Sequence, residues 1–589
     1  MPTKPSILRP DIEPLESRIS PAVILVNNFT DVLSGGTLTL RQALAAAQNA
    51  HAASTISFAA GAHNISLTGG ELYIHDLTHP LTINGGGLIT ISGNNSSRIF
   101  DFNTGTGSVV LSGLTLTGGN GSGGSSESGG AVVDFGLSLT VKDSLITGNS
   151  APGVGGGIAT YTEGTKDSFT LINSQIINNQ SSRGGGLSIV SGGPSAILNS
   201  VISGNTATNN AGGVFINTST GRTAQIVNSL IENNTASGST VPLNGGKGGG
   251  VAISNGTLKV TQSLIVSNVA SADAGGGIYI SPNGIATISN CEIGRNTATS
   301  GGGIDNVGEL TVTGSTISNN TAAEGGGLDS VLNGAINITK SLFSDNQATG
   351  GGGGGISISN SSTSTISKLT FSGDTFRDNS ASTVGGGMAV TNSSNTVPIT
   401  VTGSTFDGNT SGTRGGGVYA FSAGSLTLMA SHFTGNTASA GAGAALYSPA
   451  GVNEQVTQST FQGNVAGFNG GGLAMLGNST KFLTASVITG NLSVTTDQGY
   501  GGGGLVIKGA GALKVVASAI TGNQSGRYGG GIYDSDGSSI TLTSSKVTNN
   551  VAGSNGGGVY ISGGSAGLLT LSSGSAVSGN IAPVDPNTN

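Results

Sequence analysis

The sequence predicts an all-β protein, a single-chain parallel β-helix solenoid of about 20 coils with three short strands in each coil. Three observations predict this fold. A short motif recurs along most of the chain, its apolar positions alternate as they do in β-strands, and glycine occupies 106 of the 589 positions. A recurring unit of this kind is typical of solenoids, in which stacked repeats bury one continuous core.

One asparagine marks each repeat. Sixteen such residues follow one another at an average spacing of about 29 residues, which lies in the range of solenoid repeats. They are Asn149, Asn179, Asn205, Asn234, Asn268, Asn296, Asn320, Asn346, Asn379, Asn409, Asn436, Asn464, Asn491, Asn523, Asn550 and Asn580.

The residues before each asparagine indicate strands. The position three residues earlier is always Ile, Phe or Val, and the position five residues earlier is Ser except at Cys291 and Asp374. Apolar residues two apart share one side of a strand. Leu310 and Val312 fit this alternation, whereas the odd step from Val312 to Ser315 predicts a bend between two strands. A third apolar position follows each glycine cluster and completes the coil.

Stacking gives these recurring residues a structural role. Coils lie ~4.8 Å apart, so equivalent residues fall above one another, and about 20 coils predict a rod of ~95–100 Å. An asparagine at a corner tolerates a left-handed backbone and can pass an amide hydrogen bond to the asparagine of the next coil. Glycine clusters permit turns with positive φ and close approach of neighbouring backbones.

Composition excludes several classes of function. The chain carries 21 Lys and Arg against 28 Asp and Glu, a formal charge of −7, and has no basic stripe for nucleic acid. No apolar run approaches the ~18 residues of a transmembrane helix. The single cysteine, Cys291, has no partner in the chain for a disulfide and is expected to be a small buried side chain.

The chain divides into four segments. We expect residues 1–22, which hold five prolines and no apolar stretch, to be a disordered N-terminal tag or sorting segment. Residues 23–120 form the N-terminal cap and the first coils, residues 121–580 the repeat array, and residues 581–589 a C-terminal tail. Within the cap, the spacing of Leu40, Leu44 and Ala47 predicts a short amphipathic helix that covers the open end of the first coil.

Two groups of aspartates are candidates for a Ca²⁺ site, because Ca²⁺ prefers carboxylate and carbonyl oxygens. The first pair follows glycine clusters in consecutive coils and should stack on the outer surface; the second group lies beside successive corner asparagines and could form an acidic ridge with Arg377. The plainer interpretation of both is solvated surface acid. The candidates are Asp305 and Asp329, then Asp345, Asp378 and Asp407.

Tyrosines in the outward position after the glycine clusters are candidate ligand contacts. Tyr419 and Tyr447, and likewise Tyr533 and Tyr560, belong to adjacent coils, so their rings should stack along the surface. Exposed rings could hold sugars, although cross-coil packing explains such pairs equally well. No set of His, Ser and Asp suggests a catalytic site, and no motif suggests an organic cofactor.

The pattern GGG-[ILV]…[FI]-x-x-N, as in Gly415–Val418 and Phe406–Asn409, resembles the polymorphic outer-membrane protein repeat of bacterial surface proteins. The segment 37–74 resembles the N-terminal part of exported right-handed parallel β-helix proteins, and the segment 12–22 resembles a short tag on large surface proteins of environmental bacteria. The resemblance implies right-handed coiling and an extracellular or cell-surface location.

Two functions remain open from the sequence. The first is a secreted or cell-surface structural and adhesive rod that binds polysaccharide or another envelope component through an extended polar surface. The alternative is a polysaccharide lyase or glycoside hydrolase on the same scaffold, which needs carboxylates that converge with Arg or Lys across adjacent coils.

Overall fold

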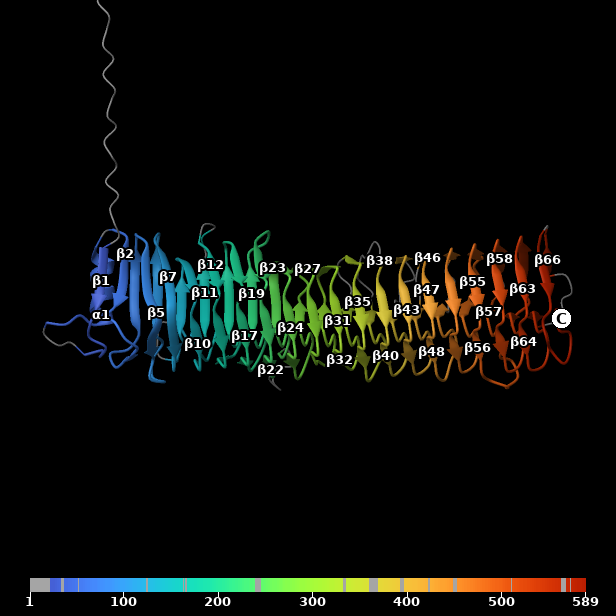
Figure 1. Cartoon of the computed structure of the whole chain (residues 1–589), viewed down its shortest axis with the longest axis horizontal. Coiled ribbons are helices and arrows are strands. Elements are labelled where there is room, and N and C mark those ends of the chain that lie inside the picture. The colour runs from blue at the N-terminus through green and yellow to red at the C-terminus, as the bar shows by residue number, and fades with distance from the viewer. Residues whose placement is uncertain are drawn as a thin grey trace, which may run out of the picture.

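The computed structural model is one long rod, with the N-terminal strands at one end and the C-terminal strands at the other (Figure 1). The structure describes residues 22–32, 36–50, 52–122, 126–162, 164, 167–238, 245–331, 335–359, 369–391, 397–421, 424–448, 453–509, 511–562, 568–572 and 574–588. Apart from residue 22, where the first strand β1 (Ala22–Val26) begins, the predicted N-terminal tag lies outside these residues.

A typical coil contains four strands. In one coil these are β30 (Glu309–Thr313), β31 (Thr316–Ser318), β32 (Thr321–Ala322) and β33 (Leu328–Val331). We call the surface formed by strands such as β30 and β31 the first face, that formed by strands such as β32 the second face, and that formed by strands such as β33 the third face. The bend predicted before Ser315 separates β30 from β31, and the two-residue strand β32 adds to the three strands that we expected.

Strands of successive coils pair in parallel, so each face is a ladder that runs along the rod. Among the described residues the third face contains eighteen strands, which indicates about 18 turns and a stack about 86 Å long. This confirms a parallel β-helix, with slightly fewer coils than the expected 20. The eighteen strands are β4 (Leu72–Leu77), β6 (Phe100–Gly105), β8 (Val132–Phe135), β11 (Ile158–Thr162), β15 (Leu187–Ser191), β19 (Val214–Thr218), β23 (Val251–Thr261), β26 (Ile278–Ile280), β29 (Ile304–Asn306), β33 (Leu328–Val331), β37 (Ile356–Ser359), β41 (Met388–Thr391), β45 (Val418–Phe421), β49 (Leu446–Ser448), β53 (Leu473–Leu476), β57 (Leu505–Lys508), β61 (Ile532–Asp534) and β65 (Val559–Ile561).

The predicted capping helix is present as α1 (Leu40–Asn49). Thr39 caps it, because its hydroxyl accepts a hydrogen bond from the backbone N–H of Gln42 while the Gln42 side chain accepts one from the backbone of Thr39. Leu40, Leu44 and Ala47 are buried, and the helix lies beside the first strands at the N-terminal end of the rod (Figure 1). It therefore covers apolar surface that an open first coil would expose to water.

The inward residues form columns, as the period predicts. In the middle of the rod five phenylalanine rings follow one another through the core, with centroids 5.2, 4.6, 4.7 and 4.8 Å apart. They are Phe343, Phe376, Phe406, Phe433 and Phe461, and each is fully buried. Aromatic contacts at these separations stabilise the stack beyond the burial of apolar area alone.

The sixteen asparagines form a continuous buried column, which we call the Asn ladder. Each Asn Nδ2 donates to the Oδ1 of the next ladder residue, at 2.8–3.1 Å in all fifteen links. That Oδ1 also accepts from the backbone N–H of the previous ladder residue, as in the 3.2 Å bond from Asn379 to Asn409. Each Nδ2 also donates to a backbone carbonyl of the preceding coil, such as that of Phe376 for Asn409. Every polar atom of these buried amides is therefore satisfied.

The left-handed backbone lies one residue before each ladder asparagine, not at the asparagine itself. All sixteen preceding residues have positive φ, between 53° and 65°. Half of them are glycine and the rest include Asn319, Asp345 and Asp378, which fits the tolerance of Asn and Asp for this region. The ladder asparagines are thus selected for their side-chain hydrogen bonds, whereas their neighbours make the turn.

The serine row forms a second polar column at the bend between the two strands of the first face. The backbone N–H of Ser174 donates to Oγ of Ser200 at 3.2 Å, and Oγ of Ser174 donates to the Ile172 carbonyl at 2.8 Å. The pattern recurs along the rod, so serine is favoured for its hydroxyl as well as for its size. At the Asp374 exception, the carboxylate accepts from the backbone N–H groups of Ser341 and Ser372, yet burial raises its pKa to about 6.

Several non-glycine residues before the serine row are strained. Ala517 has φ +49°, a left-handed conformation that costs an L-residue roughly 1–2 kcal/mol. We expect Ala517→Gly to raise the free energy of unfolding by about 0.5–1 kcal/mol in chemical denaturation. Ala519, two residues later in strand β59 (Ala519–Thr521), has no positive φ and supplies the control. Ala519→Gly should instead lower the free energy of unfolding by about 0.5–1 kcal/mol. If both substitutions changed the free energy of unfolding in the same direction and by the same amount, strain at Ala517 would be contradicted.

The last described residues continue the coil. Ile581 and Val584 bridge to Val551 and Asn555 of the preceding turn, and Oδ1 of Asn587 accepts from the backbone and side-chain nitrogens of Asn580 at 3.4 and 3.3 Å. The segment that we expected as a tail thus provides the partner for the last Asn of the ladder.

Candidate functional site

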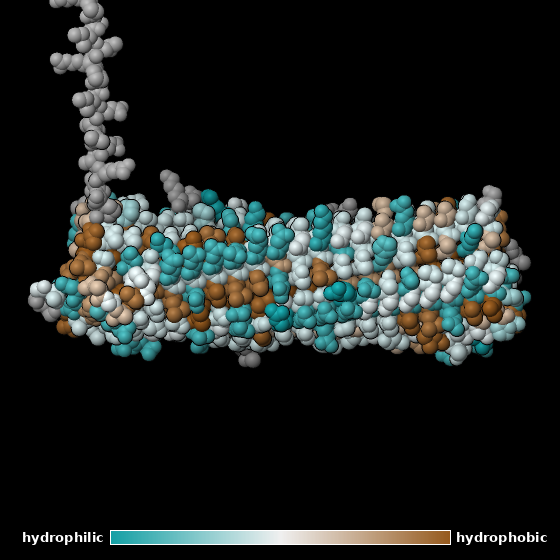
Figure 2. All heavy atoms as spheres, in the orientation of Figure 1, coloured by the Kyte–Doolittle hydropathy of each residue, from teal (hydrophilic) through white to brown (hydrophobic). Residues whose placement is uncertain are grey.

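A groove of about 500 Å³ lies over the outer side of the third face, near the C-terminal end of the rod. Its volume is within the range of sites that hold small ligands. The side of the rod that is seen in Figure 2 has polar areas that alternate with separate hydrophobic patches. The lining of the groove includes Arg414, Tyr447, Phe468, Asn469, Tyr500 and Lys508.

A column of outward side chains runs along strands β45 to β65, and two of its members, Tyr447 and Val506, line the groove. Tyr419 pairs in register with Tyr447, and the next two positions of the column are Ala474 and Val506, followed by Tyr533. Because the two smaller residues lie between the tyrosines, the column is lower there over three coil steps, ~14 Å. The side-chain sizes along this column therefore contribute to the hollow.

Aromatic residues from the loops before the glycine clusters form the wall. The rings of Phe468 and Tyr500 have centroids 5.1 Å apart, and Tyr500 is 37% exposed. Oδ1 of Asn469 accepts a hydrogen bond from the backbone N–H of Gly501 at 2.7 Å, which ties two neighbouring loops together. The Arg414 guanidinium lies 5.3 Å from the Tyr447 ring centroid, a cation–π contact.

Of the two candidate tyrosine pairs only Tyr419 and Tyr447 stack as predicted, and the tyrosines are less exposed than predicted. Tyr419 and Tyr447 have parallel rings 5.4 Å apart, whereas Tyr533 and Tyr560 are tilted by 35° and Tyr560 stacks on Tyr528 at 4.5 Å. Tyr419, Tyr447 and Tyr533 are only 8%, 7% and 3% exposed. Loop residues before the glycine clusters pack over them, and Val384, Ala442 and Tyr528 belong to the same cluster.

The hydroxyl groups of these tyrosines stay protonated. Burial raises the pKa of Tyr447, and the positive charge of Arg414 offsets only part of that effect. Burial, together with the neighbouring Tyr560 and Tyr528, raises the pKa of Tyr533 to about 12. At the groove, the neutral phenol of Tyr447 therefore lies beside two cations, Arg414 and Lys508.

The sequence pointed to the tyrosine column but missed the wall. Phe468, Tyr500 and Tyr528 each lie one or two residues before a glycine cluster, at a position that no apolar period singles out. Their recurrence in three consecutive repeats is the signal that could have found them. Arg414 occupies the position of Tyr528 in an earlier repeat. Gly501 occupies that position in the repeat of Tyr500 and bridges to Tyr528.

The aspartate pair Asp305 and Asp329 stacks in register as predicted, but it is buried and not on an open surface. The two residues are 5% and 4% exposed, and Oγ of Ser300 lies 2.8 Å and 2.6 Å from their Oδ2 atoms. One hydroxyl can donate only one proton, so a proton on one of the carboxyl groups completes the second hydrogen bond. Burial, and then the charge of Asp329, raises the pKa of Asp305 to about 7.

This pair predicts a local dependence of stability on pH. Between about pH 4 and pH 7 the folded state holds a proton on Asp305 that the unfolded chain has already released. The contribution of this proton to the free energy of unfolding is therefore complete below about pH 4 and is lost as the pH rises toward about 7. We expect Asp305→Asn to remove on the order of 1 kcal/mol of this change. Amide exchange of residues 300–331, measured by mass spectrometry at pH 5 and 8, reports the opening free energy of this part of the chain.

The half-exposed Asp407 provides the control for that experiment, since Asp407→Asn should leave exchange in residues 300–331 unchanged. Other charged groups near Asp305 are Asp273 and Lys247, whose closest oxygen and nitrogen atoms are 3.7 Å apart. If the opening free energy depended on pH in the same way in the wild type and in the Asp305→Asn variant, the shared proton would be contradicted.

The second group of aspartates does not form one ridge. Asp345 and Asp378 occupy the positive-φ position before ladder residues, whereas Asp407 pairs in register with Arg377, one residue earlier in the repeat. Arg377 Nε lies 3.7 Å from Asp378 Oδ2 in an exposed contact. Within the described residues, no group of three or more His, Cys, Asp or Glu side chains is arranged to hold a metal ion.

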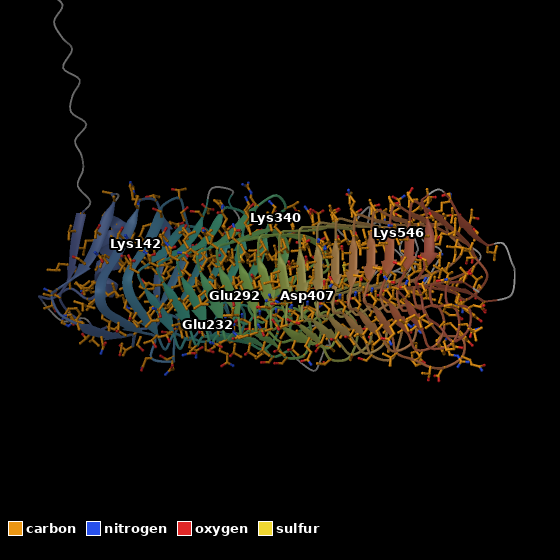
Figure 3. The ribbon with its side chains drawn as sticks, turned by 45° about the vertical axis from the view of Figure 1, so that its right-hand side comes forward. Lys142, Glu232, Glu292, Lys340, Asp407 and Lys546 are labelled. Carbon is orange, nitrogen blue, oxygen red and sulfur yellow. The ribbon has the colours of Figure 1, made fainter. Side chains whose placement is uncertain are left out.

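Charged side chains on the first face are spread along the rod. Figure 3 shows Lys142, Glu232, Glu292, Asp407 and Lys546 at separate positions from one end of the rod to the other. A shared active-site cleft would instead bring such groups together across adjacent coils. The described part of the chain also includes no helix long and apolar enough to span a membrane.

The fold and its columns define a parallel β-solenoid. A family model described as right-handed β-helix region matches residues 227–406 and 386–580, which together exceed half of the chain. The chain therefore belongs to the right-handed β-helix family, which confirms the predicted fold and its hand. No curated protein matches the sequence.

Proposed function

We propose that this protein is a non-enzymatic rod, secreted or displayed on a cell surface, that binds polysaccharide along its third face. The observation that carries the proposal is the groove beside Tyr447, with an aromatic wall of Phe468 and Tyr500 and polar groups at its edges. A location outside the cell agrees with the low charge of the chain and with its Ser-, Thr- and Asn-rich surface.

The chemistry of the groove suits a sugar. One side of a pyranose ring presents C–H groups, which are attracted to the negative face of an aromatic ring such as that of Tyr500. The hydroxyl groups of the sugar need hydrogen-bond partners, and Arg414, Lys508 and Asn469 provide donors and acceptors at the edges. The remaining surface of the rod supplies additional weak polar contacts.

Two observations favour binding over hydrolysis. Glycoside hydrolysis requires two carboxyl groups on either side of the glycosidic bond, and the charged residues that line the groove are Arg414 and Lys508. The paired carboxyl groups of Asp305 and Asp329 are buried and bonded to Ser300, so a glycosidic bond cannot lie between them.

Calorimetric titration with cellohexaose tests the proposal, and chromatography of the mixture after incubation detects any cleavage. We expect binding without turnover, and Tyr500→Ala should weaken the affinity about 3- to 10-fold through loss of one stacking ring. Phe482→Ala is a matched control, because Phe482 lies on the first face, where Lys514 is 5.5 Å from its ring. Shortened products, or equal affinity in the wild type and the Tyr500→Ala variant, would contradict the proposal.

A further inference from the structure

A second aromatic hollow lies on the same face of the rod, near its N-terminal end. It has a volume of about 660 Å³, and its lining includes Asn103, Phe135, Tyr161 and Asp167. The rings of Phe135 and Tyr161 stack with centroids 5.2 Å apart and an interplanar angle of 11°. The Tyr161 hydroxyl is held by Oγ of Ser128 at 2.8 Å, so the ring pair has a fixed orientation.

The two aromatic sites lie on one line parallel to the rod axis. Tyr161 is in the fourth position of β11, and Leu476, which lines the C-terminal groove, is in the fourth position of β53. Eleven consecutive parallel strand pairings connect β11 to β53. Eleven coil steps correspond to about 53 Å.

The outer positions of this line are mostly small or polar between the two sites. In register after Tyr161 come Val190 and Asn217, and farther along the line come Ser359, Thr391 and the exposed ring of Phe421. Each of these side chains is half-buried or exposed. The amide of Asn217 and the hydroxyl groups of Ser359 and Thr391 can make hydrogen bonds to an extended polymer that follows the line.

We propose that one neutral polysaccharide chain lies parallel to the rod axis and occupies both aromatic sites at the same time. This inference rests on the proposed function and adds to it the charge class, the direction and the minimum length of the ligand. Because both sites contain a pair of neighbouring aromatic rings, the polymer has sugar units with flat C–H faces, as in β-linked glucans.

The charges of the two sites indicate the neutral class. Arg414 and Lys508 border the C-terminal groove, whereas Asp167 borders the N-terminal hollow. A strongly anionic polymer would gain at the first site and be repelled at the second. A polymer without charge can form hydrogen bonds with Arg414 and Lys508 at the first site and with Asp167 at the second.

Simultaneous occupation has a measurable consequence. Once one site holds the chain, the second binding step is intramolecular, and linked sites can gain 10²- to 10⁴-fold in affinity when the linker spans them. A chain too short to reach the other site gains nothing. Affinity should therefore rise steeply between cellohexaose, which fits one site, and hydroxyethyl cellulose, which can span both.

The experiment titrates the full chain and two single-site variants with both probes. Tyr161→Ala removes a ring from the N-terminal hollow, Tyr500→Ala removes one from the C-terminal groove, and thermal melts verify that both variants fold. We expect two cellohexaose molecules per protein and hydroxyethyl cellulose affinity at least 10-fold higher. Either variant should lose most of that gain while its intact site still binds cellohexaose.

A long polymer also gains apparent affinity at a single site, because it offers many overlapping binding positions. This statistical gain does not need the second site, so the two variants distinguish it from simultaneous occupation of both sites. A gain that persists in both variants, or that depends on only one of them, would overturn simultaneous occupation and leave polysaccharide binding intact. Tighter binding of polygalacturonate than of hydroxyethyl cellulose would overturn the neutral class. Failure of all three probes to bind would overturn the proposed function as well.

Discussion

Replacing Asn409 by alanine is expected to lower the free energy of unfolding by about 3 kcal/mol or more. Its Oδ1 accepts from the backbone and side-chain nitrogens of Asn379 at 3.2 and 2.9 Å, and its Nδ2 donates to Asn436 and to the Phe376 carbonyl, both at 2.9 Å. Alanine removes all four hydrogen bonds and leaves buried partners that water cannot reach. Leaving a buried polar group without a partner costs about 1–3 kcal/mol each, and the effects overlap.

Chemical denaturation followed by circular dichroism measures this loss, and two further variants make it specific. Asn409→Asp keeps the shape of the side chain but places a second acceptor against Asn436 Oδ1, so it should also be strongly destabilising. Asn337→Ala removes an exposed asparagine from the first face and should change stability by less than ~0.5 kcal/mol. An Asn409→Ala protein as stable as the Asn337→Ala protein would show that the Asn ladder contributes little.

Replacing both Glu454 and Lys481 by leucine is expected to stabilise the protein by about 2 kcal/mol. These residues are 0% and 2% exposed and pair in register inside the core, between Leu426 and Leu513 of the adjacent coils. Among the described residues, neither carboxyl oxygen of Glu454 has a partner at full hydrogen-bond geometry, although the Ser448 hydroxyl is close enough to oppose the rise of its pKa. Nζ of Lys481 donates to the carbonyls of Gly477 and Ser479. Two leucines would continue the aliphatic column and remove the desolvation of two ionisable groups.

The single variant Lys481→Met is the informative comparison. Burial raises the pKa of Glu454, and the nearby lysine opposes that shift, so Glu454 loses its compensating charge in the variant. Below its raised pKa the carboxyl group stays neutral, so the stability of the variant should fall as the pH increases from 5 to 9. Midpoints of urea unfolding at these two pH values measure the effect. A double variant less stable than the wild type at pH 7 would indicate that the pair makes a favourable contact.

The core and the ladder could be predicted from the sequence because both repeat with the coil. Every inward column, such as that of Phe343 and Phe376, depends on one position per repeat and on the stacking distance alone. The direct link between successive ladder amides follows from the same periodicity. The two-residue strand β32 could not be found in this way, because alternation over two residues carries no pattern.

The features that the sequence missed depend on loops or on single residues. Tyr447 is outward on its strand, as the pattern requires, but loop residues from the adjacent repeats cover it. Glu454 and Lys481 interrupt an inward column of apolar residues, so periodicity argues against their burial. Asn587 follows Asn580 by only seven residues, and that irregular spacing hides its role at the end of the ladder.

The side-chain amides of the Asn ladder all have the same orientation. Each Oδ1 accepts from the coil on its N-terminal side, as Asn179 does from Asn149, so no link reverses the direction. An amide group has a dipole of about 3.5 D, and parallel dipoles add. The Asn ladder consequently contributes a dipole along the rod axis, with its negative end toward α1 and its positive end toward Asn580. Copies that pack side by side should favour antiparallel neighbours, and an electric pulse should align them in solution.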